Sequence, residues 1–154
     1  MDTLEDLNKE MGIFKGSVSD LVVSGESIGG LAAFQWINYF QNRVGPETRF
    51  RAIPDSGISI DAKNIKTGQY KRRLFFENIM KLSNQDIGSP IPECNKDHQD
   101  EPWKCMFIQY IHPYVTRTPI FLAESLYDAF YLSVYVGIDC LEGTSLKACP
   151  AKER

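Results

Sequence analysis

The stretch "LVVSGESIGGLAAFQWINYF", residues 21–40, joins two apolar segments through a glycine-rich turn. The short continuous apolar run at 21–23 predicts a strand buried on both faces of a mostly parallel sheet. Residues 29–44 carry apolar side chains on two stripes, which predicts a helix buried on more than one side, and Gly45-Pro46 is expected to end it. The stretch therefore predicts a strand, a tight turn and a helix in direct succession.

The turn contains Ser27 in the pattern G-x-S-x-G, which arises by chance in about one chain in twenty of this length, so its context must decide its meaning. A strand–turn–helix setting is typical of a nucleophile elbow, in which a strained backbone makes the serine hydroxyl project from the turn. Side chains at Gly25 and Gly29 are expected to collide there, and Gly30 is expected to let helix and strand approach closely. The N–H of Ile28 would point where an oxyanion forms.

Two other interpretations of this turn remain. It could be a purely structural connection between strand and helix, or a glycine-rich cradle for phosphate. The phosphate interpretation lacks support, because the stretch has neither a Walker lysine nor the spacing G-x-G-x-x-G. We therefore favour the nucleophile elbow.

The rest of the chain alternates between strand-like and helix-like segments. We expect an amphipathic helix at 3–15 (Leu4, Leu7, Met11, Phe14), a strand at 49–57, a helix at 70–82, a surface excursion at 84–104, a helix or extended segment at 105–115 that Pro113 ends, a buried strand at 118–125, and a helix beginning near Asp128. This alternation predicts a single α/β domain over residues 1–154, with a mostly parallel sheet and flanking helices.

Bulk composition excludes several classes of protein. Of the 154 residues, 43% are apolar and 24% charged, as in a soluble globular domain, and the longest apolar runs are far below the ~20 residues of a membrane span. The net charge of −3 argues against a nucleic-acid or anionic-membrane partner. The acidic start MDTLED does not resemble a signal peptide. With two histidines and no C-x-x-C, neither a metal site nor a cofactor is predicted.

Four cysteines, Cys94, Cys105, Cys140 and Cys149, lie in the second half of the chain. Their spacings of 11 and 9 suit two local disulfides, each worth roughly 3 kcal/mol in the chain-entropy description. The alternative is four unpaired thiols. Paired cysteines would indicate an oxidising compartment, which agrees with the acidic start only if the true N-terminus lies upstream of Met1.

Three segments together carry a resemblance to a known family: "VVSGESIGGLAAF", "AIPDSGISIDAKNI" and "CMFIQYIHPYVTRTPIFLAESLYDAF". In order and at compatible spacing, over roughly residues 21–130, they resemble the pectin acetylesterase/Notum family of carboxylesterases. Members carry an S-G-x-S-A-G-G-L elbow, a D-S/A-G-x-x-x-D segment, a C-F/M-F-x-Q-Y/N segment, and an apolar strand ending in Y-D or F-D. In this chain Ile28 replaces the usual alanine. The resemblance implies an α/β-hydrolase with a Ser…Asp…His triad in that chain order.

Carried over by position, the resemblance makes Ser27 the nucleophile and Asp128 the acid that orients the histidine. Without it, Asp128 is more simply an acid at a helix N-terminus. Asp55 and Asp61 match family acids, and we interpret them as structuring their loop. The family's paired cysteines correspond to Cys94 and Cys105.

The triad histidine is missing, because no histidine follows Asp128. His98, expected on the surface, and His112, expected at a packing or helix-end position, do not match the family's base. The family's upstream oxyanion loop, H-G-G or G-G-x-W, is also absent. We therefore expect the chain to be the middle of a hydrolase: a fragment, a partial gene model or a degenerate copy.

Two functional hypotheses follow. The first is a serine carboxylesterase that removes an acetyl group from a polysaccharide or a fatty acyl group from a protein, extracellular if a signal peptide precedes the chain. The second is a non-catalytic relative that binds carbohydrate or protein. A basic cluster, Lys63, Lys66, Lys71, Arg72 and Arg73, suits an acidic sugar polymer or, as we prefer, a solvated helix face.

Overall fold

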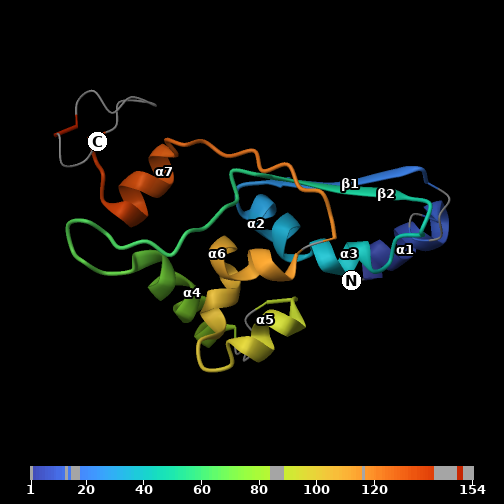
Figure 1. Cartoon of the computed structure of the whole chain (residues 1–154), viewed down its shortest axis with the longest axis horizontal. Helices are drawn as coiled ribbons and strands as arrows, with labels where there is room; N and C mark the ends of the chain where they lie inside the picture. Colours follow the sequence, from blue (N-terminus) through green and yellow to red (C-terminus); the bar gives the residue numbers. More distant parts are fainter. Residues whose placement is uncertain are drawn as a thin grey trace.

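The computed structural model describes residues 2–12, 14, 18–83, 89–115, 117–140 and 149–150. Its elements along the chain are α1 (Asp2–Met11), β1 (Asp20–Glu26), α2 (Ile28–Gln35), α3 (Ile37–Gln41), β2 (Arg49–Asp55), α4 (Lys71–Leu82), α5 (Pro92–Asp97), η1 (Pro102–Met106), α6 (Ile108–Ile111), η2 (His112–Tyr114), α7 (Ala129–Tyr131) and η3 (Leu132–Val136) (Figure 1). The strands expected around 21–23 and 49–57 and the helix at 70–82 are confirmed.

A parallel sheet forms the upper layer of the molecule in Figure 1. β1 pairs with β2 in parallel, and residues 119–123 lie along the other edge of β2. Parallel bridges join Ala52 to Ile120 and Asp55 to Ala123. The carboxyl ends of all three segments therefore meet at one edge, as in the α/β arrangement that the sequence predicts.

The strands are buried on one face only, so the expectation of strands buried on both faces is wrong. Exposed and partly buried residues alternate along β1, and Val22 is 51% exposed. In the segment 118–125 only Thr118 is buried, whereas Phe121 is 69% exposed. The reason is the placement of α2, α3, α5 and α6, which all lie on the same side of the sheet (Figure 1). Alternate side chains of each strand therefore point away from these helices.

The helix expected at 29–44 is divided at Trp36 into α2 and α3. Trp36 has φ −95° and ψ 4°, ends α2, and is 39% exposed. On either side of it, Phe34 and Ile37 are buried against the sheet, together with Phe50 of β2. The break lets both short helices place apolar side chains in the same core.

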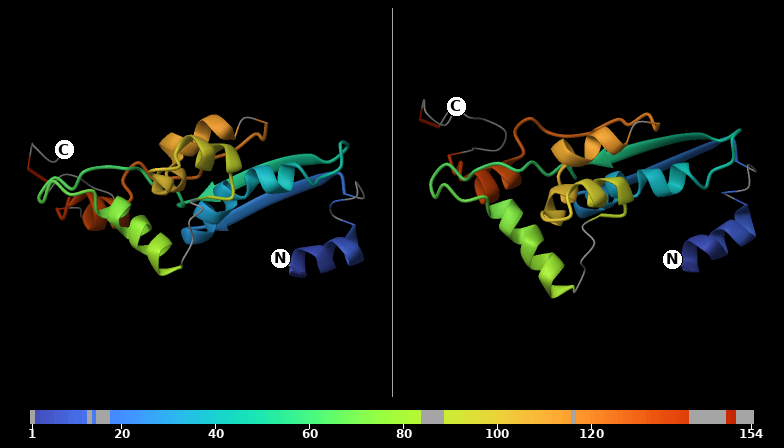
Figure 2. Two further views of the ribbon diagram at one scale, coloured as in Figure 1. Left: turned by 90° about the horizontal axis from the view of Figure 1, so that it is seen from below. Right: turned by 60° about the horizontal axis from the view of Figure 1, so that its bottom comes forward.

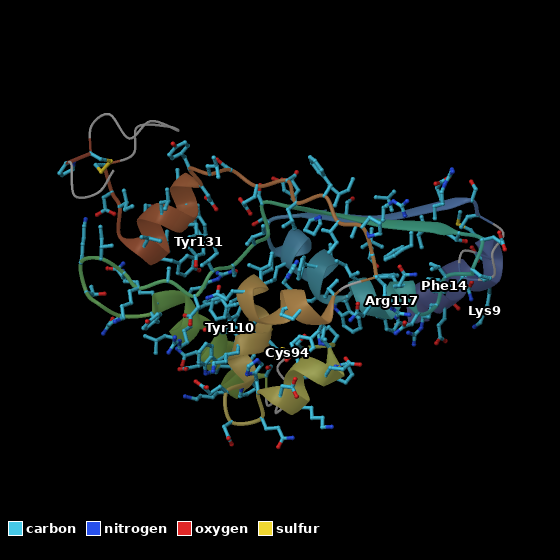
Figure 3. The ribbon with its side chains drawn as sticks, in the orientation of Figure 1. Lys9, Phe14, Cys94, Tyr110, Arg117 and Tyr131 are labelled. Atoms are coloured by element: carbon cyan, nitrogen blue, oxygen red, sulfur yellow. A yellow bond between two sulfur atoms is a disulfide. The ribbon has the colours of Figure 1, made fainter. Side chains whose placement is uncertain are left out.

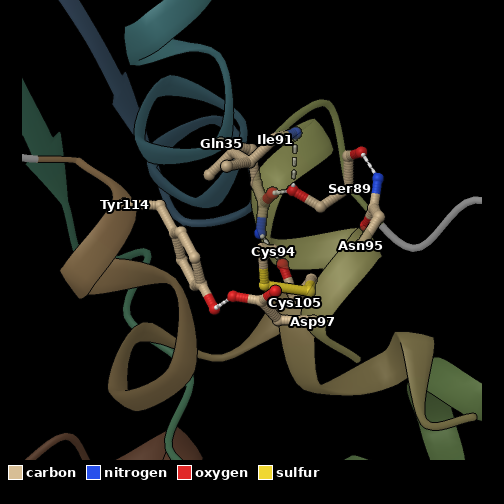
Figure 4. The surroundings of a disulfide bond; sticks show 8 residues. All are labelled: Gln35, Ser89, Ile91, Cys94, Asn95, Asp97, Cys105 and Tyr114. Atoms are coloured by element: carbon tan, nitrogen blue, oxygen red, sulfur yellow. Dashed lines mark hydrogen bonds between the residues drawn. A yellow bond between two sulfur atoms is a disulfide. The ribbon is translucent and has the colours of Figure 1, made fainter. Parts of the chain in front are cut away.

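A disulfide lies inside this core, at the centre of Figure 4. Cys94 of α5 and Cys105 of η1 have Cα atoms 5.9 Å apart and are fully buried. Gln35 of α2 donates to the carbonyl oxygen of Cys105 at 2.8 Å and accepts from the Ser89 hydroxyl at 2.6 Å. The surface excursion expected at 84–104 is therefore confirmed only in part: residues 99–101 are exposed, whereas Ile91, Cys94 and Trp103 are buried and the disulfide ties α5 to η1 in the core. Residues 84–88 lie outside the described residues.

The helices α1 and α7 lie toward opposite ends of the sheet (Figure 2). α1 ends at Met11 rather than continuing to residue 15, and the ring of Phe14 lies 6.4 Å from that of Phe40 (Phe14 is labelled in Figure 3). The side chains of Leu4 and Leu7 lie outside the described residues. At the other end, α7 begins one residue after Asp128, as expected. No helix in the described part of the chain combines the length and apolar character needed to cross a membrane.

Candidate active site

Ser27 occupies a strained turn between β1 and α2. Its backbone angles, φ 55° and ψ −117°, are sparsely populated by residues other than glycine, and such conformations cost of order 1–3 kcal/mol. The Ser27 N–H donates to the Asp55 carbonyl oxygen at 2.8 Å, and its own carbonyl accepts from the Leu31 N–H at 3.1 Å. The unusual backbone conformation predicted for this serine is thus present, and it is fixed from both sides.

Close backbone packing explains two of the three glycines around this turn. A Cβ atom on Gly25 would lie 2.3 Å from the carbonyl oxygen of Gly29, and one on Gly30 would lie 2.4 Å from that of Asp55. The expectation for Gly29 is wrong, because no atom lies within 4 Å of where its Cβ would be. Gly57, which sequence reasoning missed, is equally crowded, because a Cβ atom on it would lie 2.3 Å from the Gly30 carbonyl carbon.

The polar groups of the elbow face solvent. Ser27 is exposed, and its hydroxyl forms no hydrogen bond with any described residue. Ile28 is the first residue of α2, so its N–H has no acceptor within the helix and carries part of the positive end of the helix dipole. A solvent-exposed hydroxyl and a helix N-terminal N–H donor therefore belong to adjacent residues.

Asp128 is the N-cap of α7. Its Oδ1 accepts a hydrogen bond from the Tyr131 N–H at 3.0 Å, the structural role that the sequence left as an alternative. Among the described residues, no hydrogen bond joins Asp128 to Ser27 or to a histidine. The sheet brings the ends of β1 and of the 119–123 segment to one edge, but the structure does not join the two predicted site residues.

The two histidines lie elsewhere. His98 caps the C-terminal end of α5, is half-buried rather than on the open surface, and packs its ring 5.8 Å from that of Tyr110. His112 begins η2 and is exposed. Neither is hydrogen-bonded to Ser27 or to Asp128 in the described part of the chain.

The loop that follows β2 is held by Asp61. The Asp61 side chain is 2% exposed. Its carboxylate accepts hydrogen bonds from Nη2 and Nε of Arg73, at 2.5 and 3.3 Å. This hydrogen bonding raises the pKa of Arg73 above its ordinary value. The N–H of Asp61 donates to Gln109 Oε1 at 2.9 Å. These contacts agree with the loop-structuring interpretation of Asp61, and no local pattern in the sequence indicated the Arg73 partner.

The same loop connects the elbow to the 119–124 segment. Ser56, which has a positive φ of 49°, donates its N–H to the Ala123 carbonyl oxygen at 2.8 Å. Ile58 donates its N–H to Glu124 Oε2 at 3.2 Å. Since Asp55 also accepts from Ser27, the end of β2 lies between the elbow and the chain that leads to Asp128.

A mainly apolar hollow of about 320 Å³ lies beside the elbow. Ser24 and Gly29, which flank Ser27, line one part of it, and Trp36 and Phe40 line another. An acyl or other apolar group attached to a substrate would find contact surface here.

A parallel sheet with a strained serine at a strand-to-helix turn defines part of an α/β-hydrolase fold. The chain matches the family model of the pectinacetylesterases over residues 3–153, and it belongs to that family. The Wnt deacylase Notum from Drosophila shares the fold, with a TM-score of 0.64 and 21% identity over 82% of this chain and 36% of its own.

Two curated relatives come from Arabidopsis thaliana. Pectin acetylesterase 5 is 28% identical over 107 residues, which are 70% of this chain and 24% of that protein. Pectin acetylesterase 7 is 25% identical over 116 residues, which are 75% of this chain and 28% of that protein. The chain thus spans about a quarter of the length of these relatives.

Proposed function

We propose that this chain carries the nucleophile of a serine carboxylesterase that removes O-acyl groups from a polysaccharide. The observation that supports this most directly is Ser27, an exposed serine in a strained conformation between β1 and α2. The curated relatives are named pectin acetylesterases, which favours an acetylated polysaccharide as the substrate. An acylated protein is the second candidate substrate, because the structure that shares this fold is named a Wnt deacylase.

In the proposed reaction, Ser27 Oγ attacks the ester carbonyl carbon and loses its proton to a base. The N–H of Ile28 donates to the oxyanion of the tetrahedral intermediate. Departure of the alcohol leaves an acyl group on Ser27, and water then releases it as the carboxylic acid. Asp128 would orient the histidine that serves as base, through the carboxylate oxygen that does not cap Tyr131.

The base is the missing part of this site. Because the described residues bring neither His98 nor His112 to Ser27, we propose that the histidine is supplied by residues outside these 154. The alternative function, a non-catalytic relative that binds carbohydrate or protein, is favoured by the structural role of Asp128 as an N-cap.

We further propose an extracellular location. Two disulfides, Cys94–Cys105 and Cys140–Cys149, have Cα separations of 5.9 and 5.0 Å. Such bonds persist in oxidising compartments.

Chemical rescue tests the role of Ser27. The chain is incubated with p-nitrophenyl acetate, with and without added imidazole, beside Ser27→Ala. We expect little Ser27-dependent turnover without imidazole, because removing the base from a serine triad costs up to ~10⁶ in kcat. With imidazole, only the wild type should acquire an acetyl group on the peptide that contains residue 27, detected by mass spectrometry.

Two results would count against the proposal. Acetylation of the same extent in Ser27→Ala would mean that Ser27 is not the nucleophile. Turnover without imidazole that Ser27→Ala abolishes would place a working base within these residues.

A further inference from the structure

Arg72, in the first turn of α4, lies among aromatic rings and hydroxyl groups. Its guanidinium carbon is 4.6 to 4.9 Å from the ring centroids of Phe75, Phe76 and Tyr135. Nε and Nη2 donate to Ser59 Oγ at 3.1 and 3.0 Å, and Nη1 donates to the Tyr135 hydroxyl at 2.6 Å. A guanidinium has five N–H groups, so one on each Nη atom remains for another acceptor.

No carboxylate of the described residues pairs with Arg72. The neighbouring Arg73 is neutralised by Asp61, and Arg49 by Asp20. The other described arginines without a carboxylate partner, Arg43, Arg51 and Arg117, are exposed to solvent. Arg72 is therefore the one described arginine that is partly buried without a carboxylate. Because a desolvated cation is stabilised by an opposite charge, this environment favours an external anion.

Exposed aromatic rings lie next to this guanidinium. Phe130 is 64% exposed, and its ring lies 5.9 Å from that of Tyr135. Phe75 is also exposed, at 6.5 Å from the same ring. Tyr131, labelled in Figure 3, completes the group at 5.3 Å from Tyr135. Exposed rings of this kind offer flat apolar faces that can pack against the C–H face of a sugar.

Arg72 is connected to both parts of the candidate active site. Ser59, which accepts two of its hydrogen bonds, follows Gly57, whose backbone packs against Gly30 of the elbow. Tyr135 belongs to η3, which continues from α7 and the Asp128 cap. The guanidinium thus lies between the loop after β2 and the segment that follows Asp128.

We propose that Arg72, with the rings of Phe75, Phe130 and Tyr135, forms a subsite for a uronic-acid unit of the polysaccharide. The two unused N–H groups of Arg72 bind the sugar carboxylate end-on, in the bidentate geometry that guanidinium favours. The exposed rings pack against the sugar ring. The identity of the ligand rests on the proposed function, whereas the recognition of a carboxylate rests on the geometry of Arg72.

The test compares two ligands of equal length: the trimer of galacturonic acid and its fully methyl-esterified form. Calorimetric titration of the full chain at low salt should show the acid trimer binding about tenfold more tightly, a ratio that corresponds to roughly 1.4 kcal/mol. This comparison needs no variant, so it decides even where a substitution prevents folding. Equal affinities, or no binding of either trimer, would overturn the proposal.

Variants then assign the preference to Arg72. In Arg72→Gln the affinities for the two trimers should become equal. Arg51→Gln is the matched control, because it removes the same charge from an exposed arginine whose hydrogen bond goes to the Phe50 carbonyl oxygen. It should leave the ratio unchanged. Phe130→Ala should weaken both trimers alike. An acid preference that survives in Arg72→Gln, or disappears in Arg51→Gln, would also overturn the proposal.

Ser27→Ala separates this inference from the proposed function. It should bind the acid trimer as the wild type does, because binding at Arg72 does not need the nucleophile. A wild-type chain that is not acetylated at Ser27 in the presence of imidazole, but keeps its preference for the acid trimer, would refute the esterase and leave the subsite standing. Acetylation of Ser27 in a chain that binds the two trimers equally would refute the subsite alone.

Discussion

At the scale of single residues, the geometry of Ser27 depends on one backbone carbonyl. The Asp55 oxygen accepts from the Ser27 N–H at 2.8 Å and would also lie 2.4 Å from a Cβ atom on Gly30. Anything that displaces this oxygen therefore also disturbs the strained turn. Gly57 on the far side packs against Gly30, so the carbonyl has little room to move.

Alanine substitutions at neighbouring glycines test this dependence. Gly30→Ala should lower the free energy of unfolding by about 1–3 kcal/mol, because its Cβ overlaps a constrained backbone atom. Gly29→Ala is the matched control: its Cβ has free space, and alanine favours a helix over glycine, so stability should rise by about 0.5–1 kcal/mol. Urea unfolding followed by tryptophan fluorescence measures both. Similar effects of the two substitutions would contradict this account.

At the scale of elements, the first residues of β1 and β2 are joined by an exposed ion pair. Asp20 and Arg49 are opposite each other in the sheet, and the guanidinium donates to both carboxylate oxygens, at 2.7 and 2.8 Å. The hydrogen bonds from Arg49 lower the pKa of Asp20 from its usual 3.8 to about 2. The pair therefore joins the amino ends of the two strands across their register, and the elbow lies at their other end.

This shift predicts a specific dependence on pH. Because the folded-state pKa lies below the unfolded one, the pair contributes stability above pH 3.8 and loses it as the pH falls toward about 2. NMR titration of the Asp20 carboxyl carbon should show the low pKa, and Arg49→Gln should return it toward 3.8. A carboxyl that titrates near 3.8 in the wild type would exclude the ion pair in solution.

The two disulfides offer a comparison of loop closure with packing. Their sequence separations of 11 and 9 are similar, so the chain-entropy description assigns each a similar value of roughly 3 kcal/mol. Cys94 and Cys105, however, also belong to the main core cluster. Replacing both by alanine should therefore cost about 1–2 kcal/mol more than the same change at Cys140 and Cys149, because a cavity is left in the core. Thermal unfolding of the two double variants tests this, and equal losses would favour loop closure alone.

The sequence predicted the elements that are determined by contacts between residues close together in the chain. The β1–Ser27–α2 turn is of this kind, because its glycines and its serine stand together. The burial of Cys94 and Cys105 in the core was missed, because charged residues such as Glu93, Lys96 and Asp97 indicate a surface. Those three residues are indeed exposed, but the disulfide ties the segment that carries them to the core. The partners of Arg72 could not be predicted either, because Tyr135 is 63 residues away.

At the scale of the whole molecule, the sheet has helices on one side and exposed side chains on the other. In the described residues, β1 pairs along one edge only, and Val22 points away from the helices. Trp36, which lines the hollow beside the elbow, and Phe121 add exposed apolar surface. The chain covers 24% and 28% of its two curated relatives, so most of the length of those proteins has no counterpart in these 154 residues. The sequence showed which residues are apolar, but not which of them remain exposed to solvent in the folded chain.

An unpaired strand edge next to exposed apolar side chains predicts that the isolated chain associates with itself. Sedimentation velocity should show species larger than the monomer that grow with concentration, and a hydrophobic dye should gain fluorescence on binding.

Val22→Lys should reduce both signals, because a charged side chain on an open edge opposes pairing with a second strand. Its free energy of unfolding should change by no more than about 0.5 kcal/mol, since the residue is on the surface. Lys81→Ala, a change on exposed α4, serves as the control and should leave association unaltered. A wild-type chain that stays monomeric and binds no dye would show that this face is already covered in solution.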